Sequence, residues 1–259
     1  MIFGLGYTAS RIAAAIRRHG WHIDATGRDG NIAFDDGAAV AKALAGATHV
    51  LSSVPPDRDA GVDPVLARYR KDIPATWRGY LSSTGVYGDA KGAWVDESSP
   101  TGTGRRTARS EADENWLKLD ARAFRLPGIY GPERSIFERI AKGQAKRIDM
   151  PGQVFSRVHV DDIVAGVVAC IESNAPPGAY NLADDLPASQ NAVVEEACRL
   201  IGTEFPPLQS LEEADLSAMA RGFYAENRRV ANGKAKRVLG WQPRFRTYRE
   251  GLAALRVRA

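Results

Sequence analysis

A glycine-rich turn at the start of the chain constrains the fold more than any other feature. Apolar residues lead into G-L-G-Y-T-A at positions 4–9, and apolar residues at helical spacing follow. A strand, a G-x-G-x-x-A turn and a helix in this order are typical of dinucleotide-binding units. Gly4 allows a tight turn, Gly6 lets the backbone approach a pyrophosphate, and the small Ala9 lets the helix pack on its strand. The residues expected to contact a dinucleotide here are Gly4, Gly6, Tyr7, Thr8 and Ala9.

Strand-like and helix-like stretches alternate through the first half of the chain. We expect strands at 22–26, 49–53, 78–83 and 121–126, and helices at 38–45, 63–69 and 107–119. This alternation predicts an α/β fold with a doubly wound parallel sheet. Only three residues precede Gly4, so the first strand is short, and whether it is complete at Met1 stays open.

Beyond residue 130 the elements become shorter. Helices are expected at 136–141, 161–171 and 192–201, with an extended stretch at 179–182. We assign residues 1–130 to a dinucleotide-binding domain. Residues 131–259 are assigned mainly to a small α+β substrate-binding lobe that is interleaved with the sheet.

Composition excludes several classes of protein. The net charge of +4, from 35 Lys and Arg against 31 Asp and Glu, is too small to indicate a nucleic-acid partner. No apolar run reaches the ~18 residues that a membrane span needs, and no signal peptide fits the glycine-rich start. Cys170 and Cys198 lack metal-ligand spacing and are expected to be buried. We therefore expect a cytoplasmic protein with no metal site.

The end of the second expected strand bears on the choice of cofactor. An acid there binds the ribose hydroxyls of NAD, whereas an arginine accommodates the 2′-phosphate of NADP. Here the strand ends in Thr26-Gly27-Arg28, and Asp24 lies within the strand itself. Arg28 favours NADP, with NAD and a plain surface arginine as the alternatives. Ser53 and Val54, at the end of the next strand, are expected to contact the cofactor at the same edge.

Six motifs, spread from end to end, carry a resemblance to a known family. They are G-L-G-Y-T-A at 4–9, S-S-T-G-V-Y-G at 82–88, R-L-P-G-I-Y-G-P at 125–132, R-V-H-V-D-D at 157–162, Y-N-L-A-D-D at 180–185 and L-G-W-Q-P at 239–243. In this order and spacing, the chain resembles the extended short-chain dehydrogenases/reductases, in their atypical, NAD-dependent epimerase/dehydratase-like branch. The resemblance implies a Rossmann-type sheet, a cofactor over its carboxyl edge and a C-terminal lobe that closes on the substrate.

The resemblance also implies roles for single residues. Ser83 or Thr84 matches the hydroxyl that hydrogen-bonds the reacting oxygen. Pro127 and Ile129 match the turn beside the nicotinamide, and the segment that starts at His159 matches one that packs the two lobes together. Among the residues expected to contact the substrate are Tyr130 and Arg157.

One departure from the family puts the usual chemistry in doubt. Members that reduce or oxidise carbonyl carbons carry Y-x-x-x-K on the helix after the serine loop, and here Arg105 and Arg109 align with the tyrosine and the lysine. Arg109 can still hold the cofactor ribose. Arg105 cannot donate a proton at neutral pH. The loss of a positioned acid–base group typically costs ~10²–10⁴ in rate.

Three interpretations remain open. Tyr87 supplies the proton, with a pKa lowered by nearby arginines, although it is also expected merely to line the pocket. Alternatively, Arg105 and Arg106 clamp an anionic substrate. In the third interpretation the chain is a non-catalytic NADP(H)-binding regulator. We expect an oxidoreductase or epimerase-like enzyme that acts on a small, polar, anionic substrate, with the regulator as the alternative and a homodimer left open.

Overall fold

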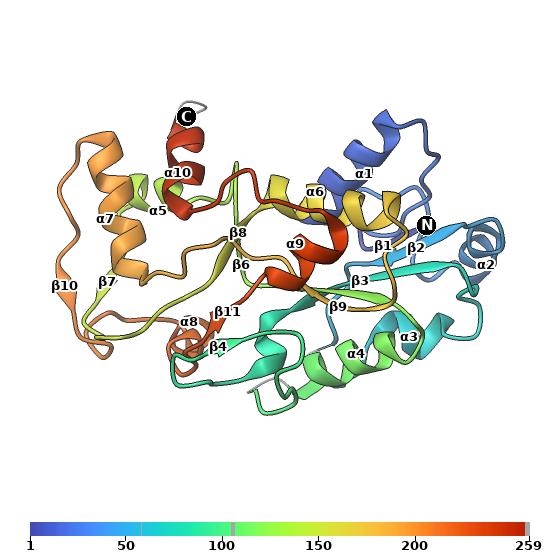
Figure 1. Cartoon of the computed structure of the whole chain (residues 1–259), viewed down its shortest axis with the longest axis horizontal. Coiled ribbons are helices and arrows are strands. Elements are labelled where there is room, and N and C mark those ends of the chain that lie inside the picture. The colour runs from blue at the N-terminus through green and yellow to red at the C-terminus, as the bar shows by residue number, and fades with distance from the viewer. Residues whose placement is uncertain (58, 105–106, 257–259) are drawn as a thin grey trace.

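The computed structural model describes residues 1–57, 59–104 and 107–256, which form two lobes side by side (Figure 1). Within these residues, one lobe is built on a five-stranded sheet in the order β1-β2-β3-β5-β9. Its strands are β1 (Ile2–Phe3), β2 (His49–Ser52), β3 (Trp77–Ser83), β5 (Arg122–Leu126) and β9 (Gly178–Asn181). Every pairing between them is parallel, so their carboxyl ends share one edge. The predicted parallel α/β sheet is confirmed.

Helices cover both faces of this sheet, above and below it in Figure 1. The first face carries α1 (Tyr7–Arg18) and α6 (Val160–Glu172), and the second carries α2 (Gly37–Ala45), α3 (Pro64–Tyr69) and α4 (Thr107–Leu117). Ile12 and Ile163 pack with Phe124 on the first face. On the second face Trp116 stacks on Tyr80, with 5.6 Å between ring centroids. Because both faces are covered, strand β5, which lies between β3 and β9, is buried at every position.

Side-chain caps fix where several helices begin. Asp63 accepts hydrogen bonds from two backbone amides at the start of α3, and Pro64 holds its first position. Ser135 and Glu138 form a capping box at the start of α5 (Ile136–Ala141). Gly202, in the left-handed conformation, ends α7 (Gln190–Ile201). These local signals explain why helix bounds follow the sequence pattern closely.

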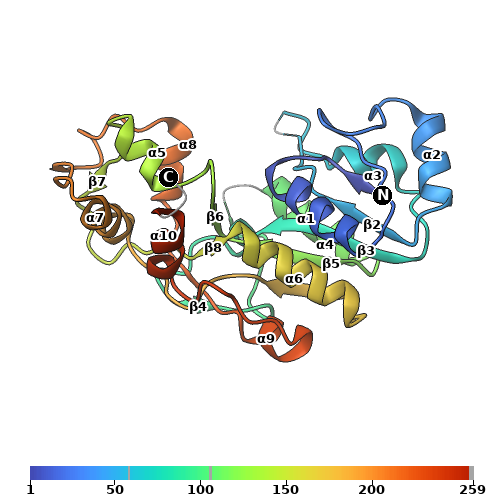
Figure 2. The ribbon, with the colours of Figure 1, turned by 90° about the horizontal axis from the view of Figure 1, so that it is seen from above.

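The second lobe is smaller and lies at the carboxyl edge of the sheet (Figure 2). It contains α5, α7, α8 (Ala218–Phe223) and α10 (Tyr248–Arg256), with the parallel pair β7 (Arg147–Ile148) and β10 (Leu208–Gln209). Ile136, Val194, Cys198 and Leu252 belong to its apolar core.

The chain passes between the lobes several times. Two further parallel pairs lie there, β6 (Gly128–Tyr130) with β8 (Arg157–His159), and β4 (Trp94–Val95) with β11 (Arg229–Val230). Helix α6, strand β9 and α9 (Gly233–Leu239) all come late in the sequence and pack in the sheet lobe. Residues beyond 130 therefore contribute to both lobes.

One expected strand is wrong. Residues 22–26 form isolated bridges, Ile2 with Ala25 and Thr26 with Ile32, rather than a strand. Ile2 donates its amide to Asp24 and accepts from Thr26. The cause is the length of β1, because a partner of two residues supports only one such contact.

The two cysteines are buried, as expected, and neither forms a disulfide. Burial raises the pKa of the Cys170 thiol to about 12, so it packs as a small apolar side chain. Across the ranges that the structure describes, none of the helices has the length and apolar character needed to cross a membrane.

Candidate functional site

The glycine turn between β1 and α1 is tightly packed. Gly4 has a φ of +82°, and a Cβ there would lie 2.8 Å from a methyl group of Val54. Gly27 has a φ of +113°, and its Cβ would lie 2.8 Å from the backbone nitrogen of Leu5. Helix α1 begins at Tyr7, and its N-cap residue, Gly6, offers no side chain to cap it. Uncapped N–H groups at a helix N-terminus can donate hydrogen bonds to a phosphate group.

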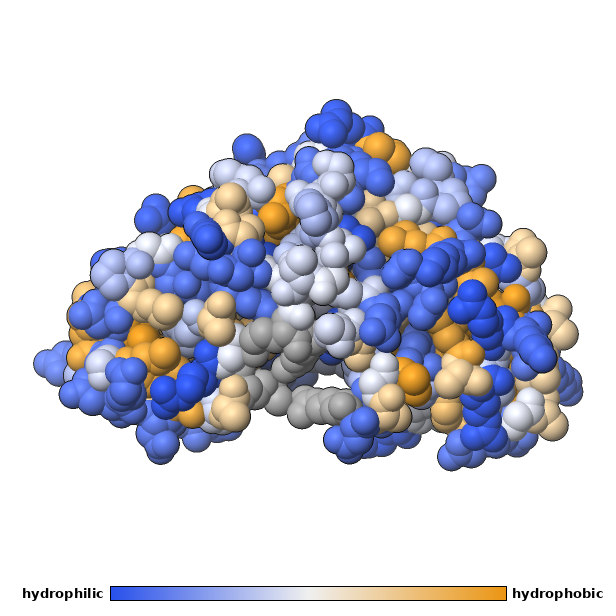
Figure 3. All heavy atoms as spheres, turned by 90° about the horizontal axis from the view of Figure 1, so that it is seen from below, coloured by the Kyte–Doolittle hydropathy of each residue, from blue (hydrophilic) through white to orange (hydrophobic). Residues whose placement is uncertain are grey.

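A cavity of about 770 Å³ begins at this turn and runs along the carboxyl edge of the sheet into the small lobe. The space-filling view shows the molecule hollowed between its two lobes (Figure 3). Ligands of open parallel sheets bind outside the carboxyl ends of the strands. The expected site residues that line the cavity are Gly6, Tyr7, Thr8, Ala9, Ser53, Ser83, Thr84, Arg109, Pro127, Ile129 and Arg157.

A serine-rich turn at the end of β3 forms the middle of the cavity. Ser83 caps the 3₁₀ helix η1 (Thr84–Tyr87) by accepting a hydrogen bond of 3.1 Å from the Gly85 amide. Thr84 is buried and Ser83 is partly exposed to the cavity. Arg109 reaches the same cavity from the first turn of α4.

The expectation that nearby arginines lower the pKa of Tyr87 is wrong. Its side chain is buried and does not line the cavity. Its hydroxyl donates to Asn181 at 2.7 Å and accepts from Arg125 at 3.0 Å. Burial raises the pKa of Tyr87 to about 12 and outweighs the opposing effect of Arg125. Tyr87 therefore holds the loop in place from behind.

A buried ion pair that the sequence did not reveal supports this loop. Arg125 on β5 and Asp113 on α4 are almost fully buried, with 2.7 Å between Nη2 and a carboxylate oxygen. The hydroxyl of Ser82, at the end of β3, donates to Asp113. The pair thus joins a helix to two strands directly beneath the cavity. Arg125, between apolar residues in the strand R-A-F-R-L, was the available signal.

Tyr130, expected to contact the substrate, also lies outside the cavity lining. Its ring meets His159 edge to face at 5.2 Å, and Gly251 of α10 packs against its hydroxyl. Burial raises the pKa of that hydroxyl. His159 is buried, and its Nδ1 accepts from the Asp161 amide at the start of α6. Both residues therefore act at the junction of the lobes.

The remaining expected cofactor residues lie around the glycine turn. Gly4 and Val54 pack together beside it without lining the cavity. Arg28 is exposed and directly follows Gly27, which touches the turn. Asp24 accepts hydrogen bonds from Asn31 at 2.8 Å and lines a different cavity. Arg105 and Arg106 lie outside the described residues.

The charged side chains that line the cavity are mainly positive, a feature that the sequence motifs do not reveal. Its basic side chains are Arg109, Arg134, Arg139, Lys146, Arg157 and Arg228, against one carboxylate, Glu226. Glu226 lies 2.9 Å from Arg228. In the described ranges, no carboxylate comes within 4.0 Å of the other five cations. Such a surplus favours an anionic ligand.

Arg157 is the most deeply buried of these cations. It donates to the carbonyls of Phe155 and Ala188 at 2.9 and 2.8 Å, and to the Gln190 side chain at 3.1 Å. All three acceptors are neutral. Burial lowers the pKa of Arg157 to about 10. The nearby carboxyl of Asp184 gives little countercharge at pH 7, since burial raises its pKa to about 8.

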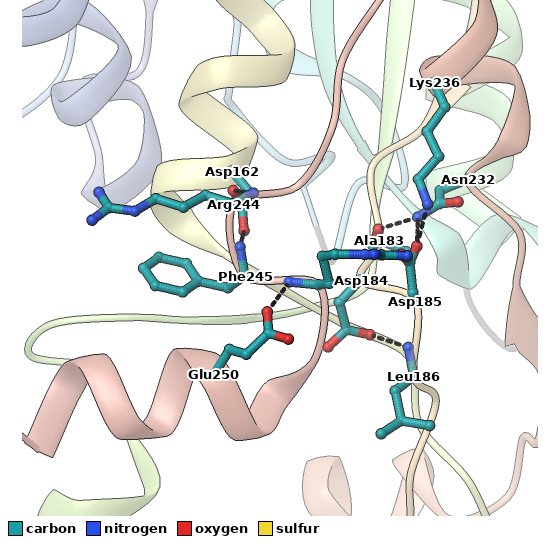
Figure 4. Close-up of polar contacts among 11 residues, drawn as sticks. Asp162, Ala183, Asp184, Asp185, Leu186, Asn232, Lys236, Arg244, Phe245 and Glu250 are labelled. Carbon is teal, nitrogen blue, oxygen red and sulfur yellow. Dashed lines mark hydrogen bonds and ion pairs between the residues drawn. The ribbon is translucent and has the colours of Figure 1, made fainter.

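Asp184 belongs to a polar junction that links the loop after β9 to α9 and α10 (Figure 4). Asp184 accepts from the Leu186 amide at 3.2 Å, and Asp185 pairs with Lys236 and Arg246. Asp162 accepts backbone hydrogen bonds from residues 244 and 245. These contacts hold the wall behind Arg157 in place. Within the described ranges, no group of three or more His, Cys, Asp or Glu residues could hold a metal ion.

Comparison with known proteins agrees with this fold. No protein-family model matches the chain. A solved structure of a functionally unknown conserved protein from Silicibacter pomeroyi DSS is 40% identical, with a TM-score of 0.88, and the match covers 100% of this chain and 98% of that one. The human epimerase family protein SDR39U1 (isoform 2), solved with NADPH, is 13% identical with a TM-score of 0.79 over 100% and 99% of the two chains. This second likeness concerns the fold.

A curated relative is the 3-diazoavenalumate denitrifying reductase of a Streptomyces species. It is 29% identical over 172 residues, which are 61% of this chain and 55% of the reductase. The chain thus spans about half the length of the curated relatives that it matches.

Proposed function

We propose that this chain, which belongs to the same family as the Silicibacter pomeroyi protein and has the fold of the extended short-chain dehydrogenases/reductases, is an NADP(H)-dependent oxidoreductase or epimerase-like enzyme that acts on a small anionic substrate. One observation carries the proposal. A single cavity joins the open N-terminus of α1 to five cations that have no carboxylate partner among the described residues.

The residues at the glycine turn fit a phosphorylated dinucleotide. The close packing of Gly4 and Gly27 leaves no room for a Cβ, and the first residues of α1, Tyr7 to Ala9, line the cavity. These amides would hold the pyrophosphate, and Arg28 would bind the 2′-phosphate. The bound nicotinamide would supply or accept a hydride beside Pro127 and Ile129.

The chain's own residues would bind and orient the substrate. Ser83, whose hydroxyl lines the cavity, would hydrogen-bond the reacting oxygen, together with Thr84. Arg109 would hold the cofactor ribose in place of the usual lysine. Arg157 and Arg139 would bind the anionic group of the substrate from the small lobe.

A substrate screen tests the catalytic part of the proposal. NADPH oxidation would be followed at 340 nm with small carbonyl compounds that carry a carboxylate or phosphate. We expect turnover in the wild-type protein and a loss of about 10²-fold in Ser83→Ala. Ser173→Ala, at an exposed helix end, is the matched control and should keep full activity.

The non-catalytic regulator is the alternative. It gains support from the position of Tyr87, which is buried away from the cavity. A protein that binds NADPH but oxidises it with no compound of the screen, and that shows no exchange of hydride, would favour the regulator.

A further inference from the structure

Aromatic rings form the wall of the cavity at its small-lobe end. Phe155 and Tyr224 both line it and meet edge to face, with ring centroids 5.4 Å apart at 87°. Phe223, at the end of α8, lines the same cavity and exposes 52% of its surface. The rings come from the loop before β8 and from α8 and its end, so the fold brings them together from distant parts of the sequence.

The same rings lie among the cations. The guanidinium carbon of Arg157 is 5.8 Å from the centroid of the Phe155 ring. Tyr224, Arg139 and Arg157 line the same cavity, and the positive charges of the two arginines oppose the rise in the Tyr224 pKa that burial causes. A ligand at this end would therefore meet apolar ring surface and positive charge at once.

Three polar side chains of the cavity already accept hydrogen bonds from the protein. Ser156 accepts from the Val230 amide, Gln190 from Arg157 and Glu226 from Arg228. A polyhydroxylated ligand would leave many hydroxyls unpaired against the rings, and that is costly in a closed site. A planar ring with one anionic group would match both the rings and the cations.

We propose that the substrate is an aromatic carboxylic acid, with its ring against Phe155 and Tyr224 and its carboxylate toward Arg139 and Arg157. This inference rests on the proposed function and narrows its substrate class. In it, Phe155 determines specificity for a planar group, because its ring packs against Tyr224 and the Arg157 guanidinium. Arg139 and Arg157 hold the carboxylate by charge-assisted hydrogen bonds.

A pair of acids with equal charge tests the proposal. Calorimetry would measure binding of trans-cinnamate and of cyclohexanecarboxylate to the full chain saturated with NADP⁺. Cinnamate carries a flat ring, whereas cyclohexanecarboxylate carries a puckered one. We expect cinnamate to bind about tenfold more tightly, and Phe155→Leu to remove most of that preference.

Controls separate this inference from the proposed function. Phe205→Leu, at an exposed ring of the small lobe outside the cavity lining, should leave the preference unchanged, and Phe155→Leu should leave NADPH affinity unchanged. Equal affinity for the two acids overturns the inference, and so does tighter binding of uridine diphosphate that displaces cinnamate. A wild-type protein that binds no NADPH overturns the proposed function and this inference together.

Discussion

The two edges of the parallel sheet carry cavities of nearly equal size and opposite character. The cavity at the carboxyl edge has about 770 Å³, and the one at the amino edge has about 750 Å³. The first is lined by the glycine turn and six cations. The second is lined mainly by apolar groups such as Trp21, Ile23 and Trp77. Among Lys and Arg residues it is lined by Lys42, and its carboxylate is that of Asp24. Volume therefore does not identify the site, whereas strand direction and charge do.

Two titratable groups of the amino-edge cavity are poor partners for an anion. Asp24 is bound by Asn31 and His22, which holds the pKa of its carboxyl below the usual value. Burial lowers the pKa of His49, so this imidazole is neutral at pH 7. Neither group offers an anion a partner. The comparison thus predicts that phosphorylated ligands bind at one edge alone.

The largest expected effect is a difference in NADPH affinity between alanine variants of two glycines, one at each edge of the sheet. Gly4 and Gly20 have φ values of +82° and +80°, so alanine strains both equally. A Cβ on Gly4 would press on Val54, but a Cβ on Gly20, in the amino-edge cavity, would meet no atom within 4 Å. Gly4→Ala should weaken NADPH binding about 100-fold, measured by calorimetry. Gly20→Ala should leave it unchanged, and equal losses in both would contradict the assignment.

A second contrast removes one positive charge from each edge. Arg139 lines the carboxyl-edge cavity, and Lys42 lines the amino-edge cavity. Each is replaced by glutamine in a separate variant. We expect the affinity for trans-cinnamate, measured by calorimetry on the protein saturated with NADP⁺, to fall about fivefold in Arg139→Gln. Lys42→Gln should behave as wild type. If the two variants lose affinity equally, net charge rather than the cavity governs anion binding.

A smaller effect depends on pH. The pKa of Asp184 is raised to about 8, so the carboxyl ionises beside Arg157 as the pH rises through that value. The new negative charge offsets Arg157, and cinnamate affinity should fall by about twofold to fivefold between pH 7 and pH 9. Asp184→Asn should remove this fall, whereas the exposed control Asp149→Asn should keep it. A pH profile that is the same in all three proteins would count against the role of Asp184.

The raised pKa of Asp184 also makes the stability of the folded protein depend on pH. An unfolded chain releases the Asp184 proton near pH 4, but the folded chain keeps it until about pH 8. The folded state therefore binds more protons in this window, and the contribution of Asp184 to stability decreases as the pH rises from 4 to 8. Thermal unfolding of Asp184→Asn should show a weaker decrease of Tm over this range than wild type.

The sequence predicted the architecture because its signals are local. The glycine turn, the apolar spacing of α1 and the caps at Asp63 and Ser135 all act within a few residues. The expected strand at 22–26 failed because a strand needs a partner of sufficient length, and β1 supplies two residues.

The site was harder to predict because its contacts span the chain. Tyr87 was expected near arginines that lower its pKa, but its hydroxyl meets Asn181, which is 94 residues away, in a buried setting that raises the pKa instead. The basic side chains that line the cavity, such as those of Arg139 and Arg157, come from separate elements. Motifs placed Ser83 and Arg109 at the cavity because each lies near the end of an element whose position the fold fixes.

Binding of NADPH and NADH to the wild-type protein and to Arg28→Ala tests the central claim most directly. Arg17→Ala, an exposed arginine at the far end of α1, is the matched control, and calorimetry reports all the affinities. The carboxyl-edge site predicts that wild-type protein prefers NADPH and that Arg28→Ala loses about tenfold in NADPH affinity with NADH affinity unchanged. A wild-type protein that binds neither nucleotide, or an Arg28→Ala protein that weakens both equally, would contradict it.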